Sequence, residues 1–266
     1  MKILVTIKQV ASLDEDFELR DDGRDVEADF HVFDLNEWDH YALEEAMRIK
    51  EGAGGDVEVV VATVGPDSAD EELRKCLAKG ADRAIRVWSD DLEESDPVGI
   101  ARVLAALARK EAPDMIFAGV QASDHAYGAT GMALAGLLNW PHAAVVAGLD
   151  YTPGANTATA RRELEGGAYA TVTVQCPAVL TLQLGINTPR YASLRGIKQA
   201  AARPIETATP AELDLPAGET GPAGSASRVR RVYVPEVGRA QMIEGTPAEQ
   251  AARLASLIKE FRGEAI

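Results

Sequence analysis

The stretch Val57-Glu-Val-Val-Val-Ala-Thr-Val64 indicates the fold class of this chain. Its apolar residues stand next to one another rather than at alternate positions, which is typical of a strand buried on both faces in a parallel sheet. Shorter runs of the same kind lie at residues 3–7, 84–88 and 115–118. A sheet built from such strands needs helices on both faces to cover it.

Helical patterns separate these apolar runs. They occupy residues 36–51, 68–79 and 96–111, and a fourth helix is expected over residues 127–138. Strands that alternate with helices predict an α/β fold with a doubly wound, mostly parallel sheet. Asn36 stands where its side chain can cap the free amides at the start of the first long helix.

The pattern changes after residue 142. Further strands are expected at residues 143–150, 157–163, 169–174 and 179–184. Gly166-Gly167 separates the second and third of these strands and predicts an antiparallel hairpin.

The last part of the chain has a different composition. Residues 207–227 are rich in Pro, Gly, Ala, Ser and Thr, which is typical of a linker or an extended arm. Residues 247–261 predict an amphipathic helix that docks on its own core or on a partner subunit. We therefore expect an α/β domain over residues 1–204, including the hairpin and the loop after it, and an arm with a C-terminal helix over residues 205–266.

The chain is acidic and has enough apolar residues for a large core. Its 266 residues include 27 Lys+Arg and 42 Asp+Glu, a formal net charge of −15, and 46% are hydrophobic. Because phosphate backbones and anionic lipids bind clustered cations, this charge argues against nucleic acid and membrane partners. No apolar run is long enough to span a bilayer, and the first residues form a strand pattern rather than a signal peptide. The two cysteines are far apart, which does not suggest a disulfide framework. We therefore expect a cytoplasmic protein.

The segment Gly119-Val-Gln-Ala-Ser-Asp-His-Ala-Tyr-Gly-Ala-Thr-Gly131 is the most informative local motif. It follows a predicted strand and leads into a predicted helix. In open α/β sheets ligands bind at the carboxyl ends of strands, and a glycine-rich turn before a helix brings backbone amides close to a phosphate. Nucleotide binding is therefore a candidate function, and tight turns with close helix packing are the alternative reason for the glycines. The segment has neither the Gly-Lys-Ser/Thr of a Walker loop nor the spacing of the dinucleotide fingerprint.

The sequence indicates no catalytic or metal-binding group of residues. The four histidines have no ligand spacing. Cys76 and Cys176 have no neighbouring His or Cys-x-x-Cys partner, and both are expected to be buried small residues.

Four segments, taken together and in this order, resemble the β subunits of electron transfer flavoproteins, from one end of the chain to the other. They are Asn36 with Ala42-Leu-Glu-Glu-Ala46; Gly119-x-Gln-Ala-x-Asp124 with Thr130-Gly131; Arg162-x-x-Glu-Gly-Gly167 before Pro177-Ala-Val-Leu-Thr181; and Asn187-x-Pro-Arg-Tyr-Ala-Ser-Leu194.

This resemblance implies an electron carrier, not an enzyme, that works as a heterodimer with an α subunit. It would take electrons from flavoprotein dehydrogenases of the acyl-CoA dehydrogenase type, as in fatty acid oxidation, and pass them to a quinone oxidoreductase. In the family, the α subunit holds most of the FAD. The β subunit has a fold like that of the adenine nucleotide α-hydrolases, binds AMP and wraps part of its chain around α. In bifurcating members a second FAD, which oxidises NADH, takes the place of AMP.

The resemblance also implies roles for particular residues. The positions that match the AMP site are Thr6, Asn36, Glu37, Trp38, Asp39, Val64, Gly119, Val120, Gln121, Ala122, Ser123, Asp124, His125, Ala126, Tyr127, Gly128, Ala129 and Thr130. The loop of residues 187–200 matches the loop with which the family anchors its partner dehydrogenases. The docking positions are Glu163, Arg190, Tyr191 and Leu194, of which Leu194 is the apolar anchor.

Several positions depart from the family pattern. Glu37 stands where proline is usual, His125 and Ala126 replace an acidic run, and Ala170 replaces a Glu or Gln. Thr130-Gly131 stands where bifurcating members have another pattern, which favours AMP over a second FAD.

Two other readings concern the same fold. One is a stand-alone module that binds adenine nucleotides. The other is an ATP-using enzyme, which is disfavoured because Lys8-Gln9-Val10, and not a pyrophosphate loop, follows the first strand.

Overall fold

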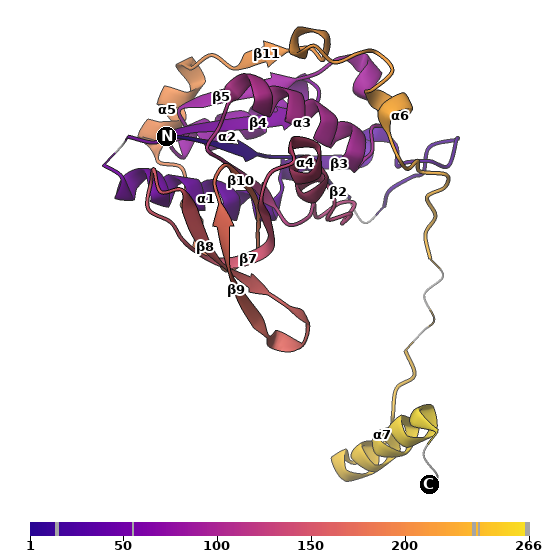
Figure 1. Ribbon diagram of the computed structural model, residues 1–266. Coiled ribbons are helices and arrows are strands. Elements are labelled where there is room, and N and C mark those ends of the chain that lie inside the picture. Colours follow the sequence, from indigo (N-terminus) through magenta and orange to yellow (C-terminus); the bar gives the residue numbers. More distant parts are fainter. Residues whose placement is uncertain (14–15, 55, 236–237, 239, 264–266) are drawn as a thin grey trace. The chain divides into compact units, whose positions relative to one another are not determined.

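The computed structural model describes residues 1–13, 16–54, 56–235, 238 and 240–263, and the chain divides into two units, Met1–Arg231 and Val232–Ile266. Figure 1 labels the helices and strands. Those of the first unit are β1 (Lys2–Thr6), β2 (Gln9–Leu13), β3 (His31–Leu35), α1 (Glu37–Gly52), β4 (Glu58–Val64), α2 (Asp70–Ala78), β5 (Arg83–Val87), α3 (Pro97–Glu111), β6 (Met115–Gly119), α4 (Thr130–Leu138), β7 (His142–Asp150), β8 (Thr157–Glu163), β9 (Tyr169–Gln175), β10 (Ala178–Leu182), α5 (Leu194–Ala202), β11 (Glu206–Ala208) and α6 (Gly221–Gly224). The second unit contains α7 (Pro247–Arg262).

One large sheet runs through the first unit (Figure 1). Its strand order is β11-β5-β4-β1-β6-β10-β7-β8-β9, and neighbouring strands are parallel from β11 to β7. β8 and β9 continue the sheet as an antiparallel hairpin, and its turn contains Gly166 and Gly167 at φ values of 72° and 76°. The predicted α/β fold, with a mostly parallel sheet and an added antiparallel hairpin, is confirmed.

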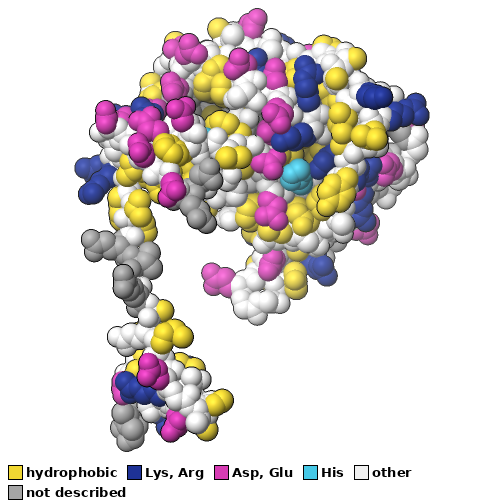
Figure 2. Space-filling view, turned by 180° about the vertical axis from the view of Figure 1, so that it is seen from behind, with side chains coloured by type: hydrophobic (Ala, Val, Ile, Leu, Met, Phe, Trp, Pro, Cys, Tyr) yellow, Lys and Arg dark blue, Asp and Glu magenta, His cyan; other side chains and the backbone are white. Residues whose placement is uncertain are grey.

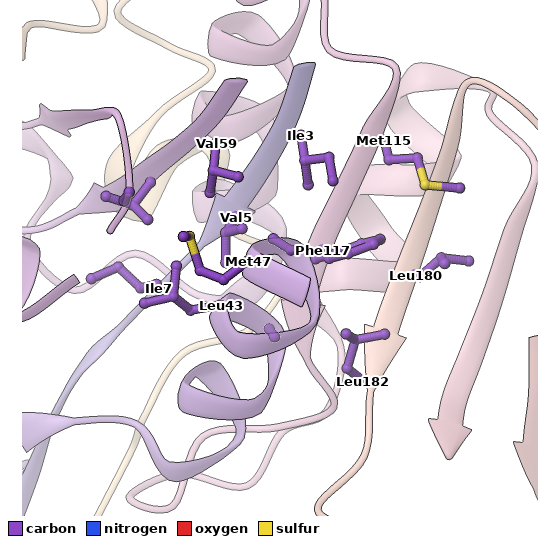
Figure 3. Packing of buried hydrophobic residues seen from close by; sticks show 14 of the residues in the cluster. Ile3, Val5, Ile7, Leu43, Met47, Val59, Met115, Phe117, Leu180 and Leu182 are labelled. Carbon is purple, nitrogen blue, oxygen red and sulfur yellow. The ribbon is translucent and has the colours of Figure 1, made fainter. Parts of the chain in front are cut away.

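Alternate residues of the central strands face opposite sides of the sheet. Because the residues on both sides are apolar, helices cover both faces. Ile3 and Val5 of β1 share a core with Leu43 and Met47 of α1, as Figure 3 shows. Leu4, which lies between them in the sequence, belongs to a second core with residues of α3 and α4. Burial on both faces is the physical reason for the consecutive apolar residues in these strands.

A small antiparallel sheet of β2 and β3 was not predicted. Two of its apolar side chains, Val32 and Phe33, are 57% and 46% exposed, so the strands lack the buried pattern that indicates a strand in the sequence. Polar contacts link β2 and β3 to the region around α2, since Gln9 bonds to Ser68 and the Asp34 carboxylate pairs with Lys75 at 2.9 Å.

Residues 206–231 form an arm that lies against the rest of the first unit and not a free linker. β11 adds a strand beside β5, and the Leu213 side chain is buried in the core on the α3 side. The Asp96 carboxylate, at the start of α3, accepts hydrogen bonds from the amides of Ala226 and Ser227 at 2.9 and 2.7 Å. Short elements and single side-chain contacts of this kind leave no periodic pattern in a stretch rich in small residues.

The helix expected over residues 127–138 begins later, at Thr130. Ala126 and Gly128 have φ values of 52° and 59°, which lie in the left-handed region and cannot belong to a right-handed α-helix.

The second unit contains the predicted C-terminal helix, α7. Glu249 accepts a hydrogen bond from the Thr246 amide at 2.8 Å, which closes the first turn of the helix. Within the described residues no side chain of α7 is buried, and Phe261 is 94% exposed. The arm predicted over residues 205–266 includes residues 236, 237, 239 and 264–266, which lie outside the described residues.

Candidate functional site

Three neighbouring parallel strands end at the candidate site. β4, β1 and β6 lie side by side, and their last residues are Val64, Thr6 and Gly119. β4 and β5 lie on one side of β1 while β6, β10 and β7 lie on the other, so the chain order reverses between β1 and β6. Open α/β sheets bind their ligands at such a point. The hydroxyl of Thr6 is buried there and donates to the Phe117 carbonyl at 3.4 Å.

Asn36 joins the start of α1 to the segment after β6. The capping of α1 predicted for its side chain is wrong. Its Nδ2 instead donates to the Gln121 carbonyl at 2.9 Å, and its Oδ1 accepts from the Ser123 amide at 3.2 Å. Asn36 is buried and both hydrogen bonds are partly buried, so water competes only in part with them, and they hold the chain between Gln121 and Ser123 in one path.

Asp39 bridges the loop after β1 and the last residue of β6. Its two carboxylate oxygens accept hydrogen bonds from the amides of Lys8 and Gly119, at 2.8 and 3.0 Å. The side chain is buried, and this burial raises the pKa of Asp39 to about 7, although the hydrogen bonds to it act in the opposite direction. Asp39 therefore fixes the spacing of two strand ends with one side chain.

Only glycine fits at position 119, because Asp39 and Trp38 of α1 lie against its backbone. A Cβ atom at this position would lie 2.5 Å from Oδ1 of Asp39 and 2.6 Å from Cβ of Trp38. The glycine that the sequence placed in a possible phosphate loop is thus required because α1 packs directly on its backbone.

A charged and aromatic group lies at the surface of the same segment. Lys8 Nζ is 2.7 Å from both carboxylate oxygens of Asp124 and 3.2 Å from Nδ1 of His125. Burial acts to raise the pKa of Asp124, but hydrogen bonds from His125 and Lys8 and the lysine charge outweigh it and hold that pKa well below its usual range. The His125 ring stacks on Tyr127, with centroids 5.8 Å apart and planes 15° from parallel.

The start of α4 offers free backbone amides to an anion. Among the described side chains none caps this helix, and its first turn has no acidic residue. The amides of the first turn of a helix attract phosphate when no side chain satisfies them. Thr130 at this helix start and Ala129 before it are half-buried, whereas Gly128 is exposed. The arrangement fits a nucleotide phosphate at α4 and a flat base near the His125–Tyr127 stack.

The remaining residues predicted for the site either form backbone hydrogen bonds that hold this segment or lie at its surface. The Val120 amide donates to the Leu182 carbonyl at 3.2 Å, and the Ala126 amide donates to the Ala122 carbonyl at 2.9 Å. Glu37 is exposed in the first turn of α1.

The loop predicted for partner docking is held on α1. Arg190 donates to the Glu44 carboxylate through Nε at 2.8 Å and through Nη2 at 3.0 Å, and it also pairs with Glu51. The contact with Glu44 joins two of the sequence segments that resemble the family. Large side chains that follow Arg190 in the loop remain exposed. Tyr191 is 98% exposed and Leu194 is 82% exposed. Arg190 therefore fixes the loop, while Tyr191 and Leu194 offer the apolar surface.

Two polar residues of this region were missed by the sequence analysis. Lys8 pairs with Asp124, and Gln183 bonds to both Trp38 and Glu163. Each lies just beyond the carboxyl end of a strand, β1 and β10 respectively. A polar residue at this place after a buried strand is a signal that could have found both.

Other kinds of site are not indicated in the described part of the chain. It contains no group of His, Cys, Asp and Glu that could hold a metal ion. None of its helices combines the length and apolar character needed to cross a bilayer. Cys76 is buried as expected, which raises the pKa of its thiol to about 12, whereas Cys176 is partly exposed. On the face drawn in Figure 2, acidic and basic side chains are both present over the first unit, so the net charge does not form a uniformly negative surface there.

Comparison with known proteins gives one consistent match. The model of the electron transfer flavoprotein domain matches residues 28–213. The chain is 63% identical over 263 residues to the electron transfer flavoprotein subunit beta of Methylophilus methylotrophus, covering 99% of this chain and 100% of that protein. It is 33% identical to the subunit of the same name from Bacillus subtilis, over 97% of this chain and 98% of that one. For the human subunit the identity is 35%, over 81% and 84% of the two chains.

Proposed function

This chain belongs to the electron transfer flavoprotein family as one of its β subunits, and from this membership we propose that it forms a heterodimer with an α subunit and carries electrons in the cytoplasm. The heterodimer takes electrons from flavoprotein dehydrogenases of the acyl-CoA dehydrogenase type and delivers them to a quinone oxidoreductase, as in fatty acid oxidation. The FAD that carries the electrons is held mainly by the α subunit.

We propose AMP as the ligand of this chain, at the carboxyl ends of β4, β1 and β6. One observation carries this assignment: Asn36 and Asp39 use buried side chains to fix the two loops that flank the switch point. Loops fixed in this way are pre-organised, so little entropy is lost when a nucleotide binds to their backbone. AMP would supply a charged phosphate for the first turn of α4 and a planar base for the aromatic surface.

We propose that partner dehydrogenases dock on the loop that contains Leu194, with Tyr191 and Glu163 as further contacts. The exposed leucine supports this role, since a single apolar anchor on a fixed loop permits rapid and reversible contact.

The test is to co-express this chain with its α subunit and to analyse the purified complex. A yellow 1:1 complex that releases one FAD and one AMP on denaturation supports the proposal. Two FAD would replace the AMP assignment by a second flavin, as in a bifurcating protein. A colourless monomer that binds ATP by itself would overturn the electron-transfer proposal and favour a stand-alone nucleotide-binding module.

The docking role has a separate test. Leu194→Ala should slow reduction of the complex by its dehydrogenase and leave the bound FAD in place, because the loop is anchored on α1 through Arg190 and not through the leucine. Loss of FAD from this variant would show that the residue serves the heterodimer instead. Ile197→Ala, which also removes an exposed apolar side chain from α5, is the control: it should slow reduction by the dehydrogenase less than Leu194→Ala does.

A further inference from the structure

Three side chains from separate elements form a continuous hydrogen-bonded chain. Trp38 lies in the first turn of α1, Gln183 directly follows β10, and Glu163 is the last residue of β8. Trp38 Nε1 donates to Oε1 of Gln183 at 3.0 Å, and Nε2 of Gln183 donates to a carboxylate oxygen of Glu163 at 3.1 Å. All three residues are half-buried, so water competes only partly with these bonds.

At one end this chain of bonds reaches the nucleotide site. Trp38 packs against Gly119 so closely that a Cβ atom on the glycine would lie 2.6 Å from Cβ of the tryptophan. The loop after β6 therefore cannot shift toward α1 without displacing Trp38. The same loop is also tied to the end of β10, since the Val120 amide donates to the Leu182 carbonyl, one residue before Gln183.

Gln183 can make its bonds in only one orientation. Its Oε1 accepts from the indole of Trp38 and also from the Leu184 amide at 3.0 Å. An indole only donates and an ionised carboxylate only accepts, so a flipped amide would set donor against donor at Trp38 and acceptor against acceptor at Glu163. The side chain is thus locked by what lies on either side of it.

At the other end the chain of bonds reaches the tip of the β8–β9 hairpin. Glu163 pairs with Tyr169 across the two strands, next to the turn that contains Gly166 and Gly167. Glu163 is also a residue of the proposed docking surface. The carboxylate of Glu163 is therefore oriented by the Gln183 amide. That amide is in turn oriented by Trp38, which packs against the nucleotide site.

We propose that Gln183 is a positioning residue that couples the nucleotide site to the β8–β9 hairpin, so that a bound nucleotide sets the orientation of Glu163 for the partner dehydrogenase. This proposal rests on the proposed function, because it assigns a regulatory consequence to the same nucleotide site. A continuous set of packed and hydrogen-bonded groups can carry coupling between two sites, and Gly119, Trp38, Gln183 and Glu163 provide one.

The first experiment measures the coupling with AMP itself. The complex with the α subunit is unfolded, freed of nucleotide and refolded with FAD, with or without AMP, and hydrogen exchange of the hairpin amides is compared. In the parent protein AMP should slow this exchange about fivefold, the factor that corresponds to about one hydrogen bond. Gln183→Leu should reduce the effect of AMP to less than about twofold while AMP still binds. Gln175→Leu, an exposed glutamine of the same hairpin outside the chain of bonds, should respond like the parent.

The second experiment needs no nucleotide. The indole N–H resonance of Trp38 is followed in a complex in which this chain carries ¹⁵N-tryptophan. Glu163→Ala should shift this resonance, because it frees the Gln183 amide, and Glu163→Gln, which keeps an acceptor, should restore it. Gln175→Leu should leave it unchanged.

The outcomes separate this proposal from the proposed function. If the parent complex does not bind AMP, the nucleotide assignment fails and the coupling to a nucleotide fails with it, whatever the tryptophan resonance shows. If AMP binds but Gln183→Leu keeps the parent response, or if the Trp38 resonance does not change in Glu163→Ala, the coupling is overturned and AMP binding stands.

Discussion

Replacing Gly119 by alanine tests whether the packing of α1 on the loop after β6 determines the nucleotide site. The added methyl group would stand 2.5 Å from Asp39 Oδ1 and 2.6 Å from Trp38 Cβ, where ordinary contacts need 3.4–4 Å. Both neighbours would have to withdraw by about 1 Å, and neither is the free end of a flexible side chain. Asp39 would then move away from one of the two amides that it bridges.

The expected cost follows from these two effects. Overpacking of a well-filled site costs about 1–3 kcal/mol, and weakening a hydrogen bond to a buried carboxylate costs about another 1.5–3 kcal/mol. A total of about 2.5–6 kcal/mol is a large part of the stability of a typical domain. For AMP we expect at least about a tenfold loss in affinity, because the loop no longer has its binding conformation before the ligand arrives.

Urea unfolding and calorimetric titration with AMP measure the two quantities, and Gly136→Ala is the matched control. Gly136 lies in α4, a Cβ atom there would meet nothing within 4 Å, and the substitution should stabilise the helix by about 0.5–1 kcal/mol. If the free energy of unfolding of Gly119→Ala lies within about 0.5 kcal/mol of the parent value and the variant binds AMP equally well, α1 does not constrain the loop and the reasoning is refuted.

Three further predictions concern charged residues. Because the pKa of Asp39 is raised to about 7, the folded chain keeps a proton that the unfolded chain releases near pH 4, so stability should fall on the order of 4 kcal/mol as the pH rises from about 4 to 7. Asp39→Asn should abolish this slope in urea titrations at several pH values, and equal slopes in both proteins would contradict the burial argument. Asp96→Ala should cost about 2–3 kcal/mol and expose residues 225–231 to protease, since this carboxylate both caps α3 and binds the Ala226 and Ser227 amides; unchanged proteolysis would show that other contacts hold the arm. Arg190→Ala should cost about 1–3 kcal/mol by removing the guanidinium that pairs with the buried Glu44, and cleavage of the loop should accelerate while Arg195→Ala has little effect.

The parts of the fold that were predicted from the sequence have local causes. Consecutive apolar residues at 57–64 reflect burial of β4 on both faces, and the Gly166-Gly167 turn follows from the left-handed backbone that both glycines adopt. The position of the candidate site was predicted for a related reason. Parallel strands place their carboxyl ends at one edge, so residues after different strands meet there.

What the sequence did not show depends on contacts between distant positions. Asn36 and Ser123 are 87 positions apart, and nothing near Asn36 distinguishes an asparagine that caps a helix from one that holds a remote loop. Gln183 is likewise one glutamine among apolar residues until the fold brings Trp38 and Glu163 to its two ends. The strands β2 and β3 were missed because their apolar side chains remain exposed at the surface.

The ion pair between Glu44 and Arg190 has a consequence for how this chain can diverge. Glu44 is almost fully buried, so a substitution of Arg190 alone removes the cation that pairs with its charge. A substitution of Glu44 alone leaves the partly exposed Arg190 paired with Glu51. Loss of both at once, with apolar residues of similar volume in their place, is far less costly. Relatives that keep Glu44 without Arg190 should therefore be rare, so changes at the two positions should be linked although 146 positions separate them.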